Sequence, residues 1–120
     1  MSQSLSTHVC FGFLLPESEG ERLYSLSDDV DWISYEYDVG ETDVVISALH
    51  WGDHYLGFFL SVPESIQESW SEPEVLNISN ILSPNVEAWG KRLKEFVEKH
   101  RIFLRDPEEE PQWWIGSSYF

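Results

Sequence analysis

The chain has 120 residues, 42% of them hydrophobic, and a formal net charge of -15. This length and apolar content fit a single acidic globular domain over residues 1–120 and argue against intrinsic disorder. The acidic balance disfavours direct binding to nucleic acid or to anionic membranes, because both depend on clustered lysine and arginine.

Charge is unevenly distributed along the chain. Residues 1–90 contain sixteen acids and one basic residue, Arg22, whereas residues 91–105 contain six basic residues and two acids. Repulsion among so many negative charges destabilises the folded chain. We therefore expect the acids to keep the chain soluble or to bind a basic partner. The single cysteine, Cys10, cannot form an internal disulfide, and residues 1–8 lack the features of a secretory signal. We therefore expect a cytoplasmic protein.

The first third of the chain predicts one strand, a loop and a second strand. Residues 8–15 are a short apolar run that ends at Pro16, as in a buried strand. Residues 17–43 hold ten acids and one arginine, and the first half of this segment has no clear periodicity, which predicts a surface loop. Residues 33–39 alternate between apolar and polar side chains, which is typical of a strand with one wet face.

Two turns predict an antiparallel meander. Gly40-Glu41 and Gly52-Asp53 can each reverse the chain. The three strands are expected at residues 33–39, 44–50 and 55–62. A two-residue turn at Gly52-Asp53 would pair Trp51 with His54 and Leu49 with Leu56. Both faces of this hairpin are mostly apolar, so it is either covered on both sides or contributes to an interface.

The second half predicts a helix and a last strand. Residues 63–83 form a long connection with a short helical turn at 66–70, and Ser83-Pro84 is typical of a helix start. An apolar stripe at three- and four-residue spacing follows. Its members are Val86, Trp89, Leu93, Phe96, Val97 and His100. The pairs Lys91/Glu95, Lys94/Glu98 and Glu95/Lys99 support the exposed face.

After residues 102–104, an acidic loop at 106–111 precedes an aromatic strand at 113–120. The expected fold is α+β, with a mostly antiparallel sheet of four to five strands and one long C-terminal helix packed on a face.

No residue pattern predicts catalysis or a bound cofactor. His50, Asp53 and His54 are of metal-ligating types, but the hairpin register would place His50 and His54 on opposite faces of the sheet. Cys10 near His8 is better explained as a buried structural thiol than as a nucleophile. We therefore expect no metal site, no cofactor and no enzyme activity.

One segment combines acids with aromatic residues. Interfaces are typically centred on aromatic anchors with charges at the rim. The candidate partner-binding residues are Asp28, Asp29, Asp31, Trp32, Tyr35, Glu36, Tyr37 and Asp38. An acidic loop that leads into an ordinary strand explains the same residues equally well. Alternate carboxylates on a strand lie about 6.6 Å apart, near the spacing of phosphates, so this face could mimic nucleic acid.

The two ends of the chain resemble those of a known group of proteins. HVCFGF at residues 8–13 and PQWWIGSSYF at residues 111–120 are similar to the ends of small acidic proteins of tailed phages and prophages. The likeness covers about sixteen residues, and Phe120 stands where that group commonly has glycine. The group has no established activity, so the resemblance implies no catalytic residues. It implies a phage context, in which small acidic proteins often bind and block host enzymes.

These observations favour a non-enzymatic inhibitor of a host protein with a basic surface, for which nucleic-acid-handling enzymes of defence or replication are candidates. One alternative is an immunity protein that neutralises a cationic toxin nuclease. Another is a structural protein that self-associates, as a homodimer for instance, through its two-sided apolar hairpin.

Overall fold

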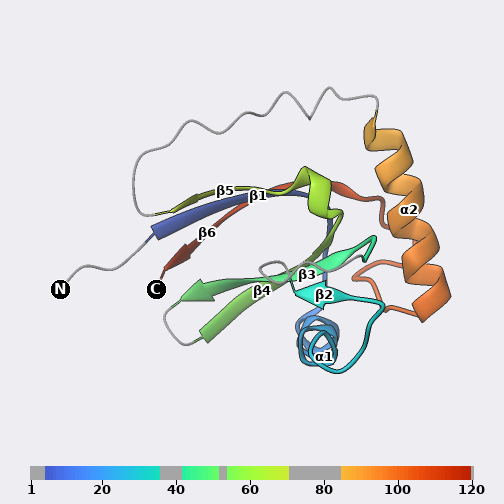
Figure 1. Ribbon diagram of the computed structural model, residues 1–120, viewed down its shortest axis with the longest axis horizontal. Coiled ribbons are helices and arrows are strands. Elements are labelled where there is room, and N and C mark those ends of the chain that lie inside the picture. The colour runs from blue at the N-terminus through green and yellow to red at the C-terminus, as the bar shows by residue number, and fades with distance from the viewer. Residues whose placement is uncertain (1–4, 36–41, 52–53, 71–84, 120) are drawn as a thin grey trace.

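A computed structural model describes residues 5–35, 42–51, 54–70 and 85–119 of the chain (Figure 1). The chain has an α+β fold. Its elements in order are β1 (Leu5–Leu14), α1 (Glu17–Leu26), β2 (Ser34–Tyr35), β3 (Val45–Trp51), β4 (His54–Ser61), the 3-10 turn η1 (Pro63–Ser65), β5 (Gln67–Trp70), α2 (Asn85–His100) and β6 (Gln112–Tyr119).

The sheet is organised around β1. This strand pairs antiparallel with β4 through residues 12–14, with β5 through residues 6–9 and with β6 through residues 5–12. Strand β3 has two parallel neighbours. It pairs with β2, and its Trp51 pairs with Tyr119 at the end of β6. The sheet is therefore mixed, and the expectation of a mostly antiparallel sheet is wrong.

The expected meander is wrong at its first strand. β2 follows α1 and runs beside the start of β3 in the same direction, with Ser34 opposite Val45. A tight turn at Gly40-Glu41 joins antiparallel neighbours only, because parallel strands need a longer crossover. Gly40 and Glu41 themselves, like residues 36–39 of the predicted strand, lie outside the described residues.

The β3–β4 hairpin forms as predicted at its tip but not along its length. Trp51 pairs with His54, yet the register shifts between Leu49 and His50, so that Leu49 lies opposite Gly57 rather than Leu56. One extra residue on β4 makes this a β-bulge, and a shift of one residue exchanges the faces of a strand. Ala48 therefore pairs with Phe58, and Ile46 with Leu60.

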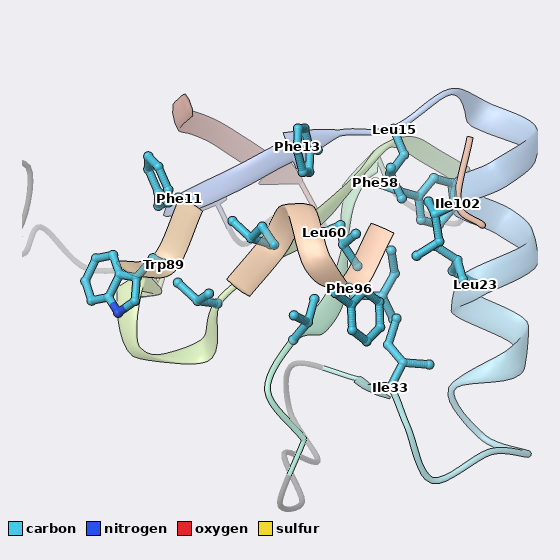
Figure 2. Packing of buried hydrophobic residues seen from close by; sticks show 14 of the residues in the cluster. Phe11, Phe13, Leu15, Leu23, Ile33, Phe58, Leu60, Trp89, Phe96 and Ile102 are labelled. Atoms are coloured by element: carbon cyan, nitrogen blue, oxygen red, sulfur yellow. The ribbon is translucent and has the colours of Figure 1, made fainter. Parts of the chain in front are cut away.

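Both helices pack on one face of the sheet. Leu23 of α1 and Leu93 of α2 are fully buried there, together with aromatic residues of β1 and β4 such as Phe13 and Phe58 (Figure 2). The hydrophobic cluster also contains Phe11, Leu15, Ile33, Val44, Ile46, Ala48, Leu60, Val62, Trp89, Phe96 and Ile102. Two helices, not one, thus cover this face.

The opposite face of the hairpin is buried as well. In Figure 1 the β5–β1–β6 layer lies over the β2–β3–β4 layer. His8 of β1 stacks on Phe59 of β4 with ring centroids 6.0 Å apart, and Trp114 of β6 lies 6.0 Å from Phe59. The indole N–H of Trp114 donates to the Gly12 carbonyl at 3.0 Å. The hairpin is therefore covered on both sides within one chain, the first of the two outcomes expected for it.

Helix α1 replaces the loop that the sequence predicts over residues 17–26. Pro16 precedes it with φ -55° and ψ 146°, and Glu17 and Glu19 stand in its first turn, where the helix dipole favours negative charge. Its buried side consists of Glu19, Gly20 and Leu23, which offers one large apolar side chain instead of a stripe. Gly20 allows close packing, since a Cβ atom there would lie 2.4 Å from the Cβ of Phe58.

The connection after β4 also differs from expectation. A helical turn does occur, but at Pro63–Ser65, and the residues predicted to be helical lie mostly in β5. Ser65 fixes this corner, because its Oγ accepts from the backbone N–H of Phe11 at 2.9 Å and donates to the carbonyl of Val62 at 2.8 Å. Residues 71–84, which include the predicted Ser83-Pro84 helix start, lie outside the described residues.

Candidate functional site

Acidic and aromatic residues share one side of α1. Glu17, Glu21, Tyr24 and Asp28 follow each other at four-, three- and four-residue spacing, which places them along one helical face or directly beyond its end. Glu17, Glu21 and Asp28 are exposed. Over residues 17–35 there are six carboxylates against the single guanidinium of Arg22.

Tyr24 lies at the centre of a group of rings from three elements. Its ring centroid is 5.1 Å from that of Tyr35 on β2 and 5.2 Å from that of Tyr55 on β4. Burial, followed by hydrogen bonding with Tyr35 and Tyr55, raises the pKa of Tyr24 above its usual value. The phenol therefore stays neutral at physiological pH and holds α1, β2 and β4 together.

A surface pocket of about 250 Å³ opens beside these rings. Glu21, Tyr24, Ser25, Tyr55 and Phe58 line it. Tyr55 is 43% exposed, although large aromatic side chains usually lie mostly inside. This pocket, which we call the aromatic pocket, combines ring surfaces with a carboxylate at the acidic side of α1.

One acid of α1 has a structural role instead. Glu19 is 5% exposed, accepts from Arg22 Nε at 2.5 Å and from Arg22 Nη2 at 2.9 Å, and also accepts from the backbone N–H of Phe103 at 2.7 Å. The hydrogen bond from Arg22 is the main reason that the pKa of Glu19 is lowered. The only basic residue of this segment is thus already engaged, and Glu19 ties α1 to the chain after α2.

The predicted site residues are divided by the structure. Asp28, Asp29 and Asp31 are exposed, whereas Trp32 and Tyr35 are half-buried. Glu36, Tyr37 and Asp38 lie outside the described residues. Of the predicted anchors, Tyr35 belongs to the tyrosine group around Tyr24, and Trp32 faces α2.

Trp32 is held by α2 through ring contacts. Its ring stacks on His100 at 4.0 Å with planes 9° apart and lies 5.9 Å from Phe96. Burial, followed by the charge of Lys99, lowers the pKa of His100. Trp32 is therefore a packing residue on at least one ring face, and it positions the acidic turn at residues 28–31.

A second hollow of about 350 Å³ lies between this turn and α2. Its lining residues are Asp31, Trp32, Thr42, Asp43, Arg92, Glu95, Phe96, Lys99 and His100. Arg92 already donates to both carboxylate oxygens of Glu64, at 2.9 and 2.7 Å, and to the carbonyl of Asp43 at 3.4 Å. Both signs of charge line this hollow, so it is less acidic than the α1 face, where residues 17–35 contribute six carboxylates and one guanidinium.

The basic residues near the C-terminal half are mostly engaged in local ion pairs. Lys91 lies 3.9 Å from Glu95, which agrees with the predicted pair, but Lys94 bonds Glu110 rather than the predicted Glu98. Arg105 contacts Glu109 at 2.8 Å. These exposed pairs contribute little stability each, but they leave the acids of α1 and residues 28–31 as the less compensated surface.

The described residues hold no group of three His, Cys, Asp or Glu side chains that could bind a metal ion. Of the candidate ligands, His54 is exposed and pairs with Trp51, the backbone of His50 pairs with Tyr55, and Asp53 lies outside the described residues. Cys10 is fully buried and outside any disulfide, as expected for a structural thiol.

Comparison with known proteins gives no relative: no family model, curated protein or solved structure matches the chain. In the part of the chain that the structure describes, neither helix is long and apolar enough to cross a membrane.

None of the five residues that line the aromatic pocket was among the predicted site residues. Glu21 and Tyr24 were assigned to a loop without periodicity, and Tyr55 to a hairpin strand. The spacing of Glu17, Glu21, Tyr24 and Asp28 could have found them, since it marks one face of a helix once α1 is recognised. Tyr55 joins them only through the tertiary fold, which no local pattern reveals.

Proposed function

We propose that the chain is a non-enzymatic cytoplasmic protein that binds and inhibits a host protein with a basic surface. The face that does so contains α1 and the turn at residues 28–31. Nucleic-acid-handling enzymes of defence or replication are the candidate targets, because their binding sites are basic and their natural ligands are acidic. The resemblance to phage proteins supplies the phage context.

The observation that carries this proposal is the exposed row of acids beside aromatic rings. Glu17, Glu21, Asp28, Asp29 and Asp31 are exposed on one continuous segment, next to the half-exposed Tyr55. Charges of one sign steer an oppositely charged partner into contact, and aromatic residues supply the binding energy at the centre. Because Arg22 is engaged by Glu19, little positive charge remains on this face.

Capture of the partner from host lysate tests the proposal. The tagged protein is compared at low salt and at about 0.5 M salt, at which screening shortens the reach of surface charges to about 4 Å. We expect a basic protein to be captured at low salt and lost or weakened at high salt. Capture of no specific protein at either salt contradicts the proposal.

A matched pair of variants locates the face. The triple variant Asp28→Asn, Asp29→Asn, Asp31→Asn should lose most of the captured partner. The triple variant Glu87→Gln, Glu98→Gln, Glu108→Gln removes the same charge from exposed positions on α2 and the loop after it, and should retain the partner. Equal loss in both variants would mean that net charge alone, rather than this face, holds the partner.

The immunity-protein alternative would depend on the same acidic face binding a basic partner. It is favoured if the captured protein is a cationic nuclease toxin whose gene adjoins that of this chain. The self-association alternative no longer needs the hairpin, whose two faces are covered within the chain, but Phe103 and Ile115 are 74% and 71% exposed. Light scattering of the purified protein distinguishes a monomer from an oligomer of defined size.

A further inference from the structure

The aromatic pocket is built from three rings that form a concave surface. The centroid distances are 5.2 Å for Tyr24–Tyr55, 5.7 Å for Tyr24–Phe58 and 5.6 Å for Tyr55–Phe58. The planes are inclined to one another by 49°, 62° and 46° in the same order. The rings are therefore inclined to one another rather than stacked, and among the described residues no further aromatic side chain lines the pocket.

This arrangement has the dimensions of a cation site. Phe58 is only 1% exposed, so the accessible ring surfaces are those of Tyr24 and Tyr55, whose centroids lie 5.2 Å apart with planes inclined by 49°. A cation between these two rings can lie within the roughly 6 Å over which cations are attracted to aromatic rings. A second ring within reach adds to the attraction of the first. The two tyrosine rings can therefore attract a cationic group that enters the pocket.

The charges around the pocket favour the same ligand. Glu21 lines the pocket from α1 and is exposed, and Glu17 and Asp28 precede and follow it on the same face. Arg22, the nearest basic residue in sequence, donates hydrogen bonds from Nε and Nη2 to Glu19. A cation that enters the pocket thus meets the tyrosine rings and the carboxylate of Glu21.

We propose that the aromatic pocket binds the guanidinium group of an arginine side chain presented by a protein partner. A guanidinium is flat, is less strongly hydrated than an ammonium group, and can lie on a ring while it donates two hydrogen bonds to one carboxylate. Glu21 is the acceptor for these bonds. This inference rests on the proposed function for the partner's biological identity, but the ligand chemistry can be tested without the partner.

The first test uses two blocked tripeptides, acetyl-Gly-Arg-Gly amide and acetyl-Gly-Lys-Gly amide, titrated into the full-length protein and followed by NMR. We expect saturable shifts at Glu21, Tyr24 and Tyr55 with the arginine peptide, and binding that is at least about twofold weaker with the lysine peptide. Shifts spread evenly over exposed acids, or equal affinity for both peptides, would overturn the proposal.

Variants assign the contributions of ring and carboxylate. Tyr55→Leu removes one ring and should weaken the arginine peptide by about two- to fivefold, whereas Tyr55→Phe keeps the ring and should bind like the wild type. Glu21→Gln should weaken binding by a similar factor. Glu87→Gln is the matched control, because Glu87 is exposed on α2 and outside this pocket. Unchanged binding in Glu21→Gln, or equal weakening in Glu87→Gln, contradicts the assignment even if Tyr55→Leu proves unstable.

The two proposals fail in different ways. Arginine-peptide binding at the pocket with no protein captured from lysate would support the ligand chemistry and reject the host target. Capture that depends on Asp28, Asp29 and Asp31 but is indifferent to Tyr55→Leu and Glu21→Gln would support the function and reject the pocket as its anchor.

Discussion

Trp32 and His100 stack face to face, with ring centroids 4.0 Å apart and planes 9° from parallel. This contact joins the acidic turn after α1 to the last turn of α2, two segments far apart in the sequence. His100 also lies 4.5 Å from Phe96 of its own helix. The position of the acidic turn therefore depends on an imidazole that can titrate.

Stability should fall in mildly acidic solution because of His100. Burial, followed by the Lys99 charge, lowers the pKa of His100 below its usual value of 6.5. A lowered folded-state pKa means that the folded state favours the neutral ring, so this stabilisation is present above about pH 6.5 and is lost as the pH falls through the folded pKa.

Urea unfolding at pH 7.5 and pH 5.5 measures this effect, and NMR titration of the His100 ring gives its pKa directly. The variant His100→Phe keeps an aromatic ring and should reduce the loss of stability between the two pH values. A His100 pKa above 6.5, or an unchanged pH dependence in His100→Phe, would show that the stacked imidazole is not responsible.

Glu19→Gln should destabilise the fold by about 1–3 kcal/mol, because it leaves the guanidinium of Arg22 and the backbone N–H of Phe103 with a weaker acceptor in a buried position. The pKa of Glu19 is lowered by its hydrogen bond with Arg22. Its contribution is therefore complete above the unfolded value of about 4.5 and is lost as the pH falls through the folded pKa.

Urea unfolding at pH 7 compares Glu19→Gln with Glu21→Gln, two residues along the same helix. Glu21 is exposed, so its substitution should change stability by less than about 0.5 kcal/mol. Similar losses in the two variants would refute a special role for Glu19.

The two helical glycines should respond to alanine in opposite directions. A Cβ atom at Gly20 would lie 2.4 Å from the Cβ of Phe58, whereas nothing lies within 4 Å of a Cβ atom at Gly90 of α2. Gly90→Ala should stabilise the protein by about 0.5–1 kcal/mol, the gain expected from helix propensity. At Gly20 the added methyl group would clash with Phe58, so Gly20→Ala should destabilise the protein by about 1–3 kcal/mol despite the higher helix propensity of alanine. Thermal melts of both variants suffice, and a stabilised Gly20→Ala would mean that α1 can move away from β4.

Ser65→Ala should lower the free energy of unfolding by about 1–3 kcal/mol. It removes the acceptor for the buried backbone N–H of Phe11, at the connection between β4 and β5. Ser18→Ala, at an exposed position of α1, is the control and should be nearly neutral. The measurement is urea unfolding, with amide exchange at Phe11 as a local reporter. Unaltered protection of that amide in Ser65→Ala would contradict this account of the corner.

Sequence patterns predicted the elements whose apolar residues are dense. The strand at residues 8–15, the hairpin tip, the stripe of α2 and the aromatic last strand all correspond to described elements, β1, β3–β4, α2 and β6. In each case local periodicity and core packing favour the same structure. The α+β class followed from these elements alone.

The sequence-based predictions were wrong for elements whose structure depends on tertiary contacts. α1 buries Glu19 and Gly20 beside Leu23, so an ion pair and a close approach replace the apolar stripe by which helices are recognised. The bulge near Leu49 and the parallel direction of β2 depend on partners that a turn rule does not include. The candidate site was affected in turn, because the aromatic pocket requires α1 as a helix and Tyr55 beside it.

Leu5 pairs with Tyr119 at one end of the β1–β6 ladder, so the first and last described strands lie side by side. During synthesis, β1 must wait for almost the whole chain before its longest partner emerges from the ribosome.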